Sequence, residues 1–563
     1  MLRPRRHTLR MRIKPLRHRK IHNRLPQLVQ RSLERAGHHE GCKGQSELCR
    51  VRYVLPSERA RRLTRCLMEI TSQSDSKTVR TYSAESLSKK QIARWMGVAI
   101  AAFHVAYLVP ALAFLMVLFL YALIKLTEAP TPRWAFYPAL LVGIASYAPQ
   151  TTFLWGLFGV VAISLWTILS IWIAFFVLMA WSLRRVPWFA AHMWVWALSL
   201  PVMWMGLEYF RSELYWLKFA WLTPGIAIAN GWILDLLLVK NLGIYGTGFA
   251  VMAVAALFTI FGFRPFLKLS PWIFVVVLVY LILLPSLNGS GPRPGLVVGI
   301  QLEGPSEAEI LHALNAAVSK YPDLKLLVMS EYSLDTPPTR AIRNWCQENG
   351  RYLIIGGKEI TEKISRGKEV WTDTAFVIDP KGDIVFSQGK VVPIQFFDDG
   401  APAKGQQLWN SPWGKVGICI CYDLSFTRVT DELIRQGATL LVVPTMDAEK
   451  WGAYEHHLHA LIAPARALEY NVHIVRVGSS GISQITSGFG FSQNTAPFPG
   501  QGEMVAAQLL SKRLLREGSL PLDRHFAPLC VVLTGSTALF LLVRRYWGVE
   551  LWAYWNFLFR NVI

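Results

Sequence analysis

Charged residues, and acidic ones above all, are scarce in this sequence. Of 563 residues only 17% are charged, with 37 Asp or Glu against 59 Lys or Arg, whereas 52% are hydrophobic and 22 are Trp. A soluble domain usually carries about 25% charged residues. A large part of the chain is therefore expected to lie in lipid.

Cysteines are also few, and their arrangement excludes a disulfide framework. The seven cysteines are scattered, odd in number and without paired spacing, so we expect no structural disulfide. The group His38, His39, Cys42 and Cys49 does not have the spacing of a zinc site.

The basic excess is confined to the N-terminal end. Residues 1–90 hold 23 Lys or Arg against 7 Asp or Glu, out of a net charge of +22 for the chain. Without a sustained apolar period, residues 1–93 are predicted to be a disordered, basic cytoplasmic tail. The natural start could also be Met68 or Met96. A nucleic-acid-binding function would rest on this tail alone, and we expect no nucleic-acid partner.

Long apolar runs follow, and each approaches the roughly 20 residues that a membrane-spanning helix needs. They lie near 96–125, 134–150, 154–182, 187–208, 241–262, 271–288 and 526–544. Because lipid cannot satisfy backbone polar groups, the runs are predicted to be helices. They define a transmembrane helical domain, 94–289, and a C-terminal transmembrane helix and tail, 516–563. Pro110 interrupts the first run, which leaves seven or eight spans open.

Basic residues flanking these runs predict the orientation. The tail, Arg184-Arg185, residues 264–268 and Arg544-Arg545 should lie in the cytoplasm. Counting the first run as two spans then places residues 290–515 on the extracytoplasmic side. The runs contain few ionisable residues at mid-membrane depth, which argues against a transporter.

Residues 290–515 differ in kind from the rest. Short β-branched runs, as at 296–300 and 439–443, alternate with helical stretches such as 307–320 and 427–436. This alternation predicts a soluble α/β domain of about 220 residues, large enough for its own core.

The sharpest chemical signal is a strand at 415–421 that ends in Cys421, close to a helix predicted from Thr427. A helix N-terminus lowers the pKa of a thiol, so the pattern is typical of a nucleophilic cysteine. On this motif alone, Cys419 and Cys421 could equally be core residues. Glu331 and Lys390 each follow a strand of their own, and each could be a surface charge or a working group.

The ordered set Glu331, Lys390 and Cys421-Tyr422-Asp423, followed by residues 466–471, resembles the nitrilase (carbon–nitrogen hydrolase) superfamily. Together with the membrane half, the chain resembles the apolipoprotein N-acyltransferase family over about 94–545. Other similar segments are 208–211, 216–222, 243–246, 297–301, 446–448, 455–471 and 479–483. The resemblance implies a polytopic α-helical membrane domain joined to an α/β nitrilase-type αββα sandwich.

The resemblance also implies a catalytic set. Glu331 would take the proton of Cys421, an acyl thioester would form, and Lys390 would stabilise the oxyanion. The family has a glutamate shortly after the lysine; here Phe396 stands at that place, and Asp398 or Asp399 could substitute. The spacing of His456, His457 and His459 does not suit a metal site, so no metal and no cofactor are expected.

The implied reaction moves an acyl chain from a membrane phospholipid to the N-terminal S-diacylglyceryl-cysteine of lipoproteins, in the cell inner membrane. An alternative that uses the same three residues is a membrane-tethered amidase or nitrilase, in which water takes the acyl group.

Overall fold

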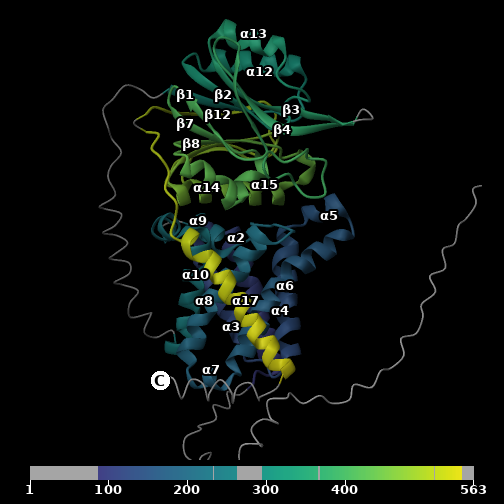
Figure 1. Cartoon of the computed structure of the whole chain (residues 1–563), viewed down its shortest axis with the longest axis vertical. Helices are drawn as coiled ribbons and strands as arrows, with labels where there is room; N and C mark the ends of the chain where they lie inside the picture. Colours follow the sequence, from purple (N-terminus) through teal and green to yellow (C-terminus); the bar gives the residue numbers. More distant parts are fainter. Residues whose placement is uncertain (1–85, 232–233, 263–294, 365–367, 513, 548–563) are drawn as a thin grey trace, which may run out of the picture. The chain divides into compact units, whose positions relative to one another are not determined.

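The computed structural model of the chain describes residues 86–231, 234–262, 295–364, 368–512 and 514–547. Helices dominate the part before residue 262, and two β-sheets dominate the part after residue 295 (Figure 1). The helical elements of the first part are α2 (Lys89–Leu108), η2 (Pro110–Leu115), α3 (Met116–Leu126), α4 (Pro132–Gln150), α5 (Phe153–Phe158), α6 (Val161–Arg184), α7 (Pro187–Ala191), α8 (Met193–Tyr209), η3 (Phe210–Leu214), α9 (Pro224–Ala229) and α10 (Leu234–Phe261). A long helix, α17 (Asp523–Trp547), follows the sheets.

Three of the described helical segments are long and apolar enough to cross a membrane. They are Val161–Arg184, Leu238–Phe261 and Asp523–Tyr546, each of 24 residues. At 1.5 Å per residue, each is about 36 Å long, which exceeds the roughly 30 Å hydrocarbon core of a bilayer. They fall on the spans predicted near 154–182, 241–262 and 526–544. The span predicted near 271–288 lies outside the described residues.

The first predicted run is divided into two packed helices. α2 ends at Leu108, a 3₁₀ turn begins at Pro110, and α3 follows from Met116. Proline has no N–H and clashes with the preceding turn, so an α-helix rarely continues through it. α2 also begins earlier than the apolar run does, because Ser88 and Gln91 form a capping box at its start.

The second part contains two six-stranded sheets, ordered β12-β1-β2-β3-β4-β5 and β11-β10-β9-β8-β7-β6. Neighbours β1, β2 and β3 are parallel, and so are β7, β8 and β9. The strands are β1 (Gly295–Gln301), β2 (Leu324–Met329), β3 (Tyr352–Ile364), β4 (Lys368–Ile378), β5 (Ile384–Gly389), β6 (Leu408–Ser411), β7 (Gly414–Ile418), β8 (Leu440–Thr445), β9 (His473–Gly478), β10 (Ser483–Thr486), β11 (Ser492–Ala496) and β12 (Glu503–Leu510).

Buried side chains define four layers. One cluster joins the inner faces of the two sheets, for example Val328 with Val442. A second cluster packs α12 (Glu307–Lys320) and α13 (Arg340–Asn349) on the outer face of the first sheet. α14 (Thr427–Arg435), α15 (Ala453–Ala460) and α16 (Ile462–Tyr470) cover the second sheet (Figure 1). This confirms the predicted fold class of a helical region with apolar spans and an αββα sandwich.

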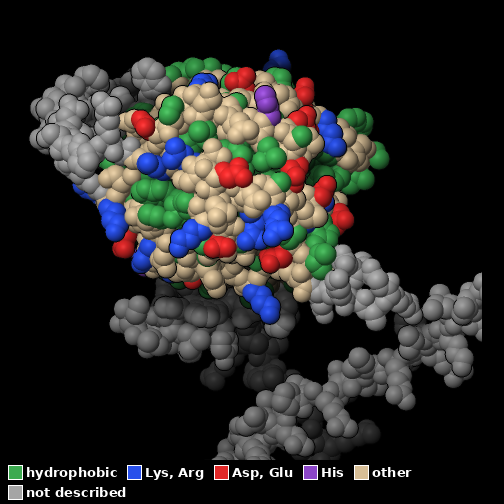
Figure 2. Space-filling view, turned by 90° about the horizontal axis from the view of Figure 1, so that it is seen from above, with side chains coloured by type: hydrophobic (Ala, Val, Ile, Leu, Met, Phe, Trp, Pro, Cys, Tyr) green, Lys and Arg blue, Asp and Glu red, His purple; other side chains and the backbone are tan. Residues whose placement is uncertain are grey.

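The two parts of the described chain share one core. Residues of α14 to α16 belong to the same buried cluster as residues of α2 to α10, for instance Leu433 with Ile226. The surface viewed from above in Figure 2 carries interspersed basic and acidic side chains, as a face in water does. In contrast, Leu141, Ile163 and Leu539 on α4, α6 and α17 are each more than half exposed, as expected for a lipid-facing surface.

Buried charges join the sandwich to α17. Arg524 Nη2 lies 3.0 Å from Glu469 Oε1 on α16, and Arg524 Nε lies 2.9 Å from Asp431 on α14. Glu469 Oε1 also accepts the backbone N–H of Ile244, just after α10 departs from helical geometry at Gly243, whose φ is +81°. Two helices of the membrane part are therefore anchored on the outer helices of the sandwich.

Candidate active site

The structure brings Glu331, Lys390 and Cys421 together from three strand ends. Glu331 follows β2, Lys390 follows β5, and Cys421 follows β7. All three are buried, and Lys390 Nζ lies 2.6 Å from Glu331 Oε1. The carboxyl ends of neighbouring parallel strands meet at one edge of a sheet, so facing sheets can gather such residues. The alternative that Glu331 and Lys390 are charges on the protein surface is therefore wrong.

Met446 links the carboxylate to the thiol. Its backbone N–H donates to Glu331 Oε2 at 2.6 Å, and its carbonyl oxygen lies 3.7 Å from Cys421 Sγ as acceptor of the thiol hydrogen. Met446 follows directly on β8, so it holds both groups from the same strand end.

The charges of the site are set by burial and by Lys390. Burial alone would raise the pKa of Glu331, but the Lys390 ammonium outweighs it and holds that pKa below its usual range. Burial also opposes the charge on Lys390, yet Glu331 and its other anionic neighbours raise the pKa of Lys390 well above the usual value. Burial and the Glu331 carboxylate raise the pKa of the Cys421 thiol well above normal. The resting site is therefore a carboxylate, an ammonium and a neutral thiol.

This finding corrects the prediction that a helix N-terminus lowers the pKa of the thiol. Cys421 opens a short 3₁₀ turn, η4 (Cys421–Ser425), and α14 begins only at Thr427. The first N–H of α14 donates instead to Glu213 Oε1 at 3.1 Å. The thiol sits among carboxylates rather than at a helix terminus, so it needs a base to become a nucleophile.

The backbone at Cys421 is in a conformation that non-glycine residues rarely adopt, with φ of +52°. Asp423 fixes this turn, because its carboxylate accepts the N–H groups of Ile420, Val391 and Val392. The loop after Lys390 and the turn at Cys421 are thereby held by one carboxylate. Burial raises the pKa of Asp423 to about 6, although Lys390 and these N–H groups lower it.

Of the two candidate replacements for the family's additional glutamate, Asp399 lies in the site and Asp398 does not. Asp399 Oδ2 lies 2.8 Å from Lys390 Nζ and accepts the N–H of Ile394 at 2.6 Å. Tyr332 donates its hydroxyl to the other oxygen at 2.6 Å. Asp398 is exposed to solvent.

Asp373 is a fourth buried carboxyl group, which sequence reasoning missed. It lies on β4 with Oδ2 3.6 Å from Lys390 Nζ. Burial, followed by the Glu331 charge, raises the pKa of Asp373 well above its usual value. The available signal was an acidic residue shortly before the apolar run 375–378 of β4, where a carboxyl group is costly to bury unless it has a task.

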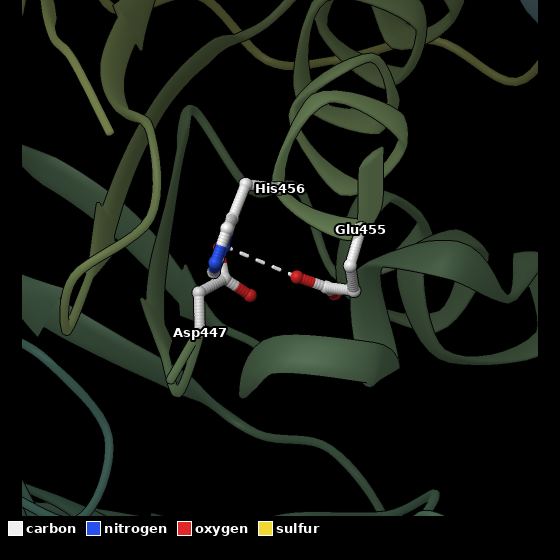
Figure 3. A group of neighbouring side chains, drawn as sticks. All are labelled: Asp447, Glu455 and His456. Carbon is white, nitrogen blue, oxygen red and sulfur yellow. Dashed lines mark ion pairs between the residues drawn. The ribbon is translucent and has the colours of Figure 1, made fainter. Parts of the chain in front are cut away.

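Two groups of acidic and histidine side chains are close enough to hold a cation, and each already has a cationic partner. Lys390 neutralises the first, Glu331, Asp373 and Asp399. In the second, shown in Figure 3, Asp447, Glu455 and His456 converge, and Arg476 pairs with Asp447. The expectation that no metal binds stays a prediction.

Cys421 opens into an apolar cavity of about 930 Å³, counting the part open to the outside. α5 and α6 contribute one wall, with Phe158, Leu165 and Ile168 among others. The segment before α9 contributes residues 217–219 and Trp221, and the sandwich contributes Ile394, Gln395, Phe396, Phe397, Tyr422, Trp451, Glu455 and His459. Phe396 thus lines the cavity at the place where the family has a glutamate.

The membrane part and the sandwich also meet through hydrogen bonds beside Cys421. Trp221 Nε1 donates to Ser425 Oγ at 2.9 Å, and Tyr422 donates its hydroxyl to the carbonyl of Lys218 at 3.0 Å. These bonds fix the segment 217–221 against the turn that holds the thiol.

Comparison with known proteins matches both halves of the chain. The sequence model of the apolipoprotein N-acyltransferase N-terminal domain matches residues 96–257, and that of the carbon–nitrogen hydrolase family matches residues 298–506. The two occur here in one chain and in this order. The chain belongs to the apolipoprotein N-acyltransferase family, within the nitrilase superfamily.

The chain matches only part of the length of its curated relatives. An apolipoprotein N-acyltransferase of Geobacter metallireducens is 25% identical over 349 residues, which is 53% of this chain and 66% of the relative. A formamidase of Bacillus cereus is 30% identical over 168 residues, 25% of this chain and 49% of the relative.

Solved structures similar to the sandwich include a Saccharomyces cerevisiae member of branch 10 of the nitrilase superfamily, with 20% identity and a TM-score of 0.35. It covers 40% of this chain and 94% of that structure. An amidase from Nesterenkonia has 18% identity and a TM-score of 0.33, covering 41% of this chain and 95% of that structure.

Proposed function

We propose that the protein is an N-acyltransferase that moves an acyl chain from a membrane phospholipid, through a thioester on Cys421, to the amino-terminal S-diacylglyceryl-cysteine of a lipoprotein. The observation that carries this proposal is the cavity at Cys421. One of its walls consists of apolar side chains of α5 and α6, and α6 is a candidate membrane span. An acyl chain in the bilayer could enter such a cavity without crossing water.

In the first half-reaction, Glu331 takes the proton of Cys421 and the thiolate attacks the ester carbonyl of the donor. The ester C–O bond then breaks, and Glu331 gives its proton to the departing oxygen of the lysophospholipid, which leaves the thioester on Cys421. Lys390 then stabilises the developing oxyanion. An ammonium has three N–H donors. One donates to Glu331 Oε1, and Asp399 Oδ2 lies 2.8 Å away as an ion-pair partner, so a donor remains for the oxyanion. The backbone N–H of Tyr422 supplies a second donor.

In the second half-reaction the amino group of the acceptor attacks the thioester, and the Cys421 sulfur leaves. Both lipid substrates are held beside the sulfur by the membrane helices, which makes the encounter local.

We further propose that the sandwich lies on the extracytoplasmic side. α17 connects the sandwich, through Arg524, to a basic end at which Arg544 Nη2 donates to the carbonyl of Arg185 at 3.4 Å. The sandwich and this basic cluster are thus at opposite ends of one candidate span. Because basic flanks favour the cytoplasm, the sandwich would face away from it.

The test is mass spectrometry of the purified full-length protein after incubation with phospholipid vesicles. The expected result is an acyl mass on the peptide that contains Cys421. Addition of a synthetic S-diacylglyceryl-cysteine peptide should then move that mass to the peptide amine. An unmodified Cys421 peptide would contradict the proposal, and release of free fatty acid in the presence of the acceptor would favour the membrane-tethered hydrolase instead.

A further inference from the structure

The second half-reaction releases one proton more than the triad takes back. The acceptor arrives as an ammonium at pH 7, because an α-amino group has a pKa of about 7.7–8.0. The ammonium must lose one proton to become a nucleophile, and its nitrogen loses another when the amide forms. The C–S bond breaks, and Glu331 can pass one proton back to the leaving thiolate. The other proton needs a second acceptor.

The cavity contains two suitable groups apart from the triad. Glu455 and His459, both on α15, line it together with Cys421. His459 Nδ1 lies 2.7 Å from Asp447 Oδ1, which fixes the tautomer with hydrogen on Nδ1 and a lone pair on Nε2. Nε2 is buried and has no hydrogen-bond partner in the described part of the chain.

The His459 ring is held in place. It stacks on Trp221 with a centroid distance of 5.0 Å and an interplanar angle of 29°. Glu455 Oε1 lies 3.5 Å from His459 Nδ1, while Glu455 Oε2 is 3.1 Å from His456 Nδ1 (Figure 3). This second oxygen is buried and makes no hydrogen bond with any residue that the structure describes.

The group formed by Asp447, Glu455, His459 and Arg476 can accept one proton without acquiring a net positive charge. Two carboxylates, Asp447 and Glu455, face a single permanent cation, Arg476. Burial would lower the pKa of His459, but Asp447 and Glu455 outweigh it and raise that pKa. Burial, followed by Asp447, raises the pKa of Glu455. Further titratable neighbours are His456 on the same helix, and Lys218, Cys421 and Tyr422 in the lining of the same cavity.

We propose that Glu455 and His459 receive the proton that the ammonium of the incoming acceptor must lose before it attacks the thioester. Asp447 is a positioning residue in this arrangement, because it acts only through His459. The proposal rests on the transferase function, and it assigns the two kinds of proton transfer to different groups. The triad forms and breaks the thioester, and the α15 pair activates the amine.

The test compares two acceptors on full-length protein that has first been loaded with acyl groups from phospholipid vesicles. One acceptor is the S-diacylglyceryl-cysteine peptide, and the other is the same peptide with an aminooxy group in place of the amine, whose nitrogen is already neutral at pH 7. Transfer is expressed as the rate per loaded acyl-enzyme, because Glu455 and His459 line the cavity and their substitution can also change the loading of Cys421. Glu455→Gln and His459→Gln should slow transfer to the amine acceptor about 10-fold at pH 7, roughly the ratio of ammonium to free amine for a pKa of about 7.7–8.0. Transfer to the aminooxy acceptor should slow much less, so the ratio of the amine rate to the aminooxy rate should fall in these variants.

His457→Gln is the matched control, because His457 is exposed on the same helix. It should transfer to both acceptors at the wild-type rate. Unchanged amine transfer in Glu455→Gln and His459→Gln would overturn the inference, and so would equal slowing with both acceptors, which indicates a cavity-wall role. If wild-type Cys421 never acquired an acyl mass, the transferase function itself would fall; a normal acyl-enzyme with unaffected variants would remove only the inference.

Discussion

Asp399 Oδ2 lies 2.8 Å from the Nζ of Lys390, which also contacts Glu331 at 2.6 Å. The ammonium is thus shared by two carboxylates, one on each side. Asp399 restrains Lys390 so that its remaining N–H can point toward the reacting carbonyl.

Asp399→Asn should therefore slow thioester formation. We expect a loss of about one order of magnitude, below the roughly 10²–10³ for removal of an oxyanion donor itself. The rate of acyl loading measured by mass spectrometry checks this. Asp398→Asn is the control, since Asp398 is exposed and has the same chemistry. Equal effects of the two substitutions would show that Asp399 does not act through Lys390.

The two neighbouring buried thiols should differ in function. Cys421→Ala should abolish the acyl-enzyme, because no other group can hold the acyl chain. Cys419→Ala should keep the reaction and cost on the order of 1–2 kcal/mol in unfolding free energy through a small cavity. Mass spectrometry and thermal unfolding in detergent measure the two effects. An acyl mass that persists on Cys421→Ala protein would exclude Cys421 as the nucleophile.

Substitutions of Glu331 and of Lys390 should differ in their effect on the free energy of unfolding. Glu331→Gln keeps the size of the side chain and leaves Asp399 to pair with Lys390, so activity should be lost while the fold survives. Lys390→Ala leaves two buried carboxylates without their cation, which typically costs about 3–5 kcal/mol. Thermal unfolding of both variants gives the comparison. A larger loss of stability in Glu331→Gln would contradict this account of the charges.

Arg524 should be essential for the joint between α17 and the sandwich. Arg524→Met removes the partner of Asp431 and Glu469, both buried, and should destabilise the protein by about 3–5 kcal/mol. Arg435→Met is the control, because Arg435 is half exposed and lies 3.6 Å from the same Asp431. Its loss should cost at most about 1 kcal/mol. Similar unfolding temperatures for the two variants would refute the assignment.

The proposed orientation predicts which positions a membrane-impermeant thiol reagent can reach in intact cells. Ala308→Cys, exposed on α12, should be labelled without lysis, and Ala190→Cys, exposed on α7, only after lysis. The native cysteines found in the described residues, Cys346, Cys419, Cys421 and Cys530, are buried, so their background should be low. The reverse pattern would place the sandwich in the cytoplasm.

The fold class and the location of the site were predictable, because both depend on patterns that are local in sequence. The apolar runs identified candidate helices such as α6 and α17. The strand ends made Glu331, Lys390 and Cys421 candidates, and the resemblance to the nitrilase superfamily joined them into one set. In an α/β sheet the side chain that follows a strand lies at the sheet edge, so three such residues could be expected to meet.

Other features depend on contacts between segments that are distant in sequence. Asp398 and Asp399 are adjacent, and only the path of the loop decides which one reaches Lys390. Asp373 became part of the site because β4 lies beside β5. The raised pKa of Cys421 follows from burial among carboxylates, which a local helix argument does not include.

The wall of the cavity at Cys421 is built partly by the sandwich and partly by helices outside it, and this has a consequence for the selectivity of inhibitors. If Cys421 is the nucleophile, as proposed, a compound that reacts with the thiol alone would not distinguish it from a similarly activated cysteine in another protein. Phe158, Leu165 and Ile168 come from helices outside the sandwich, and the carbon–nitrogen hydrolase match does not extend to them. An electrophile with an apolar tail long enough to contact these three side chains should therefore discriminate this protein from proteins that have only the carbon–nitrogen hydrolase domain, whatever the reactive group of the compound.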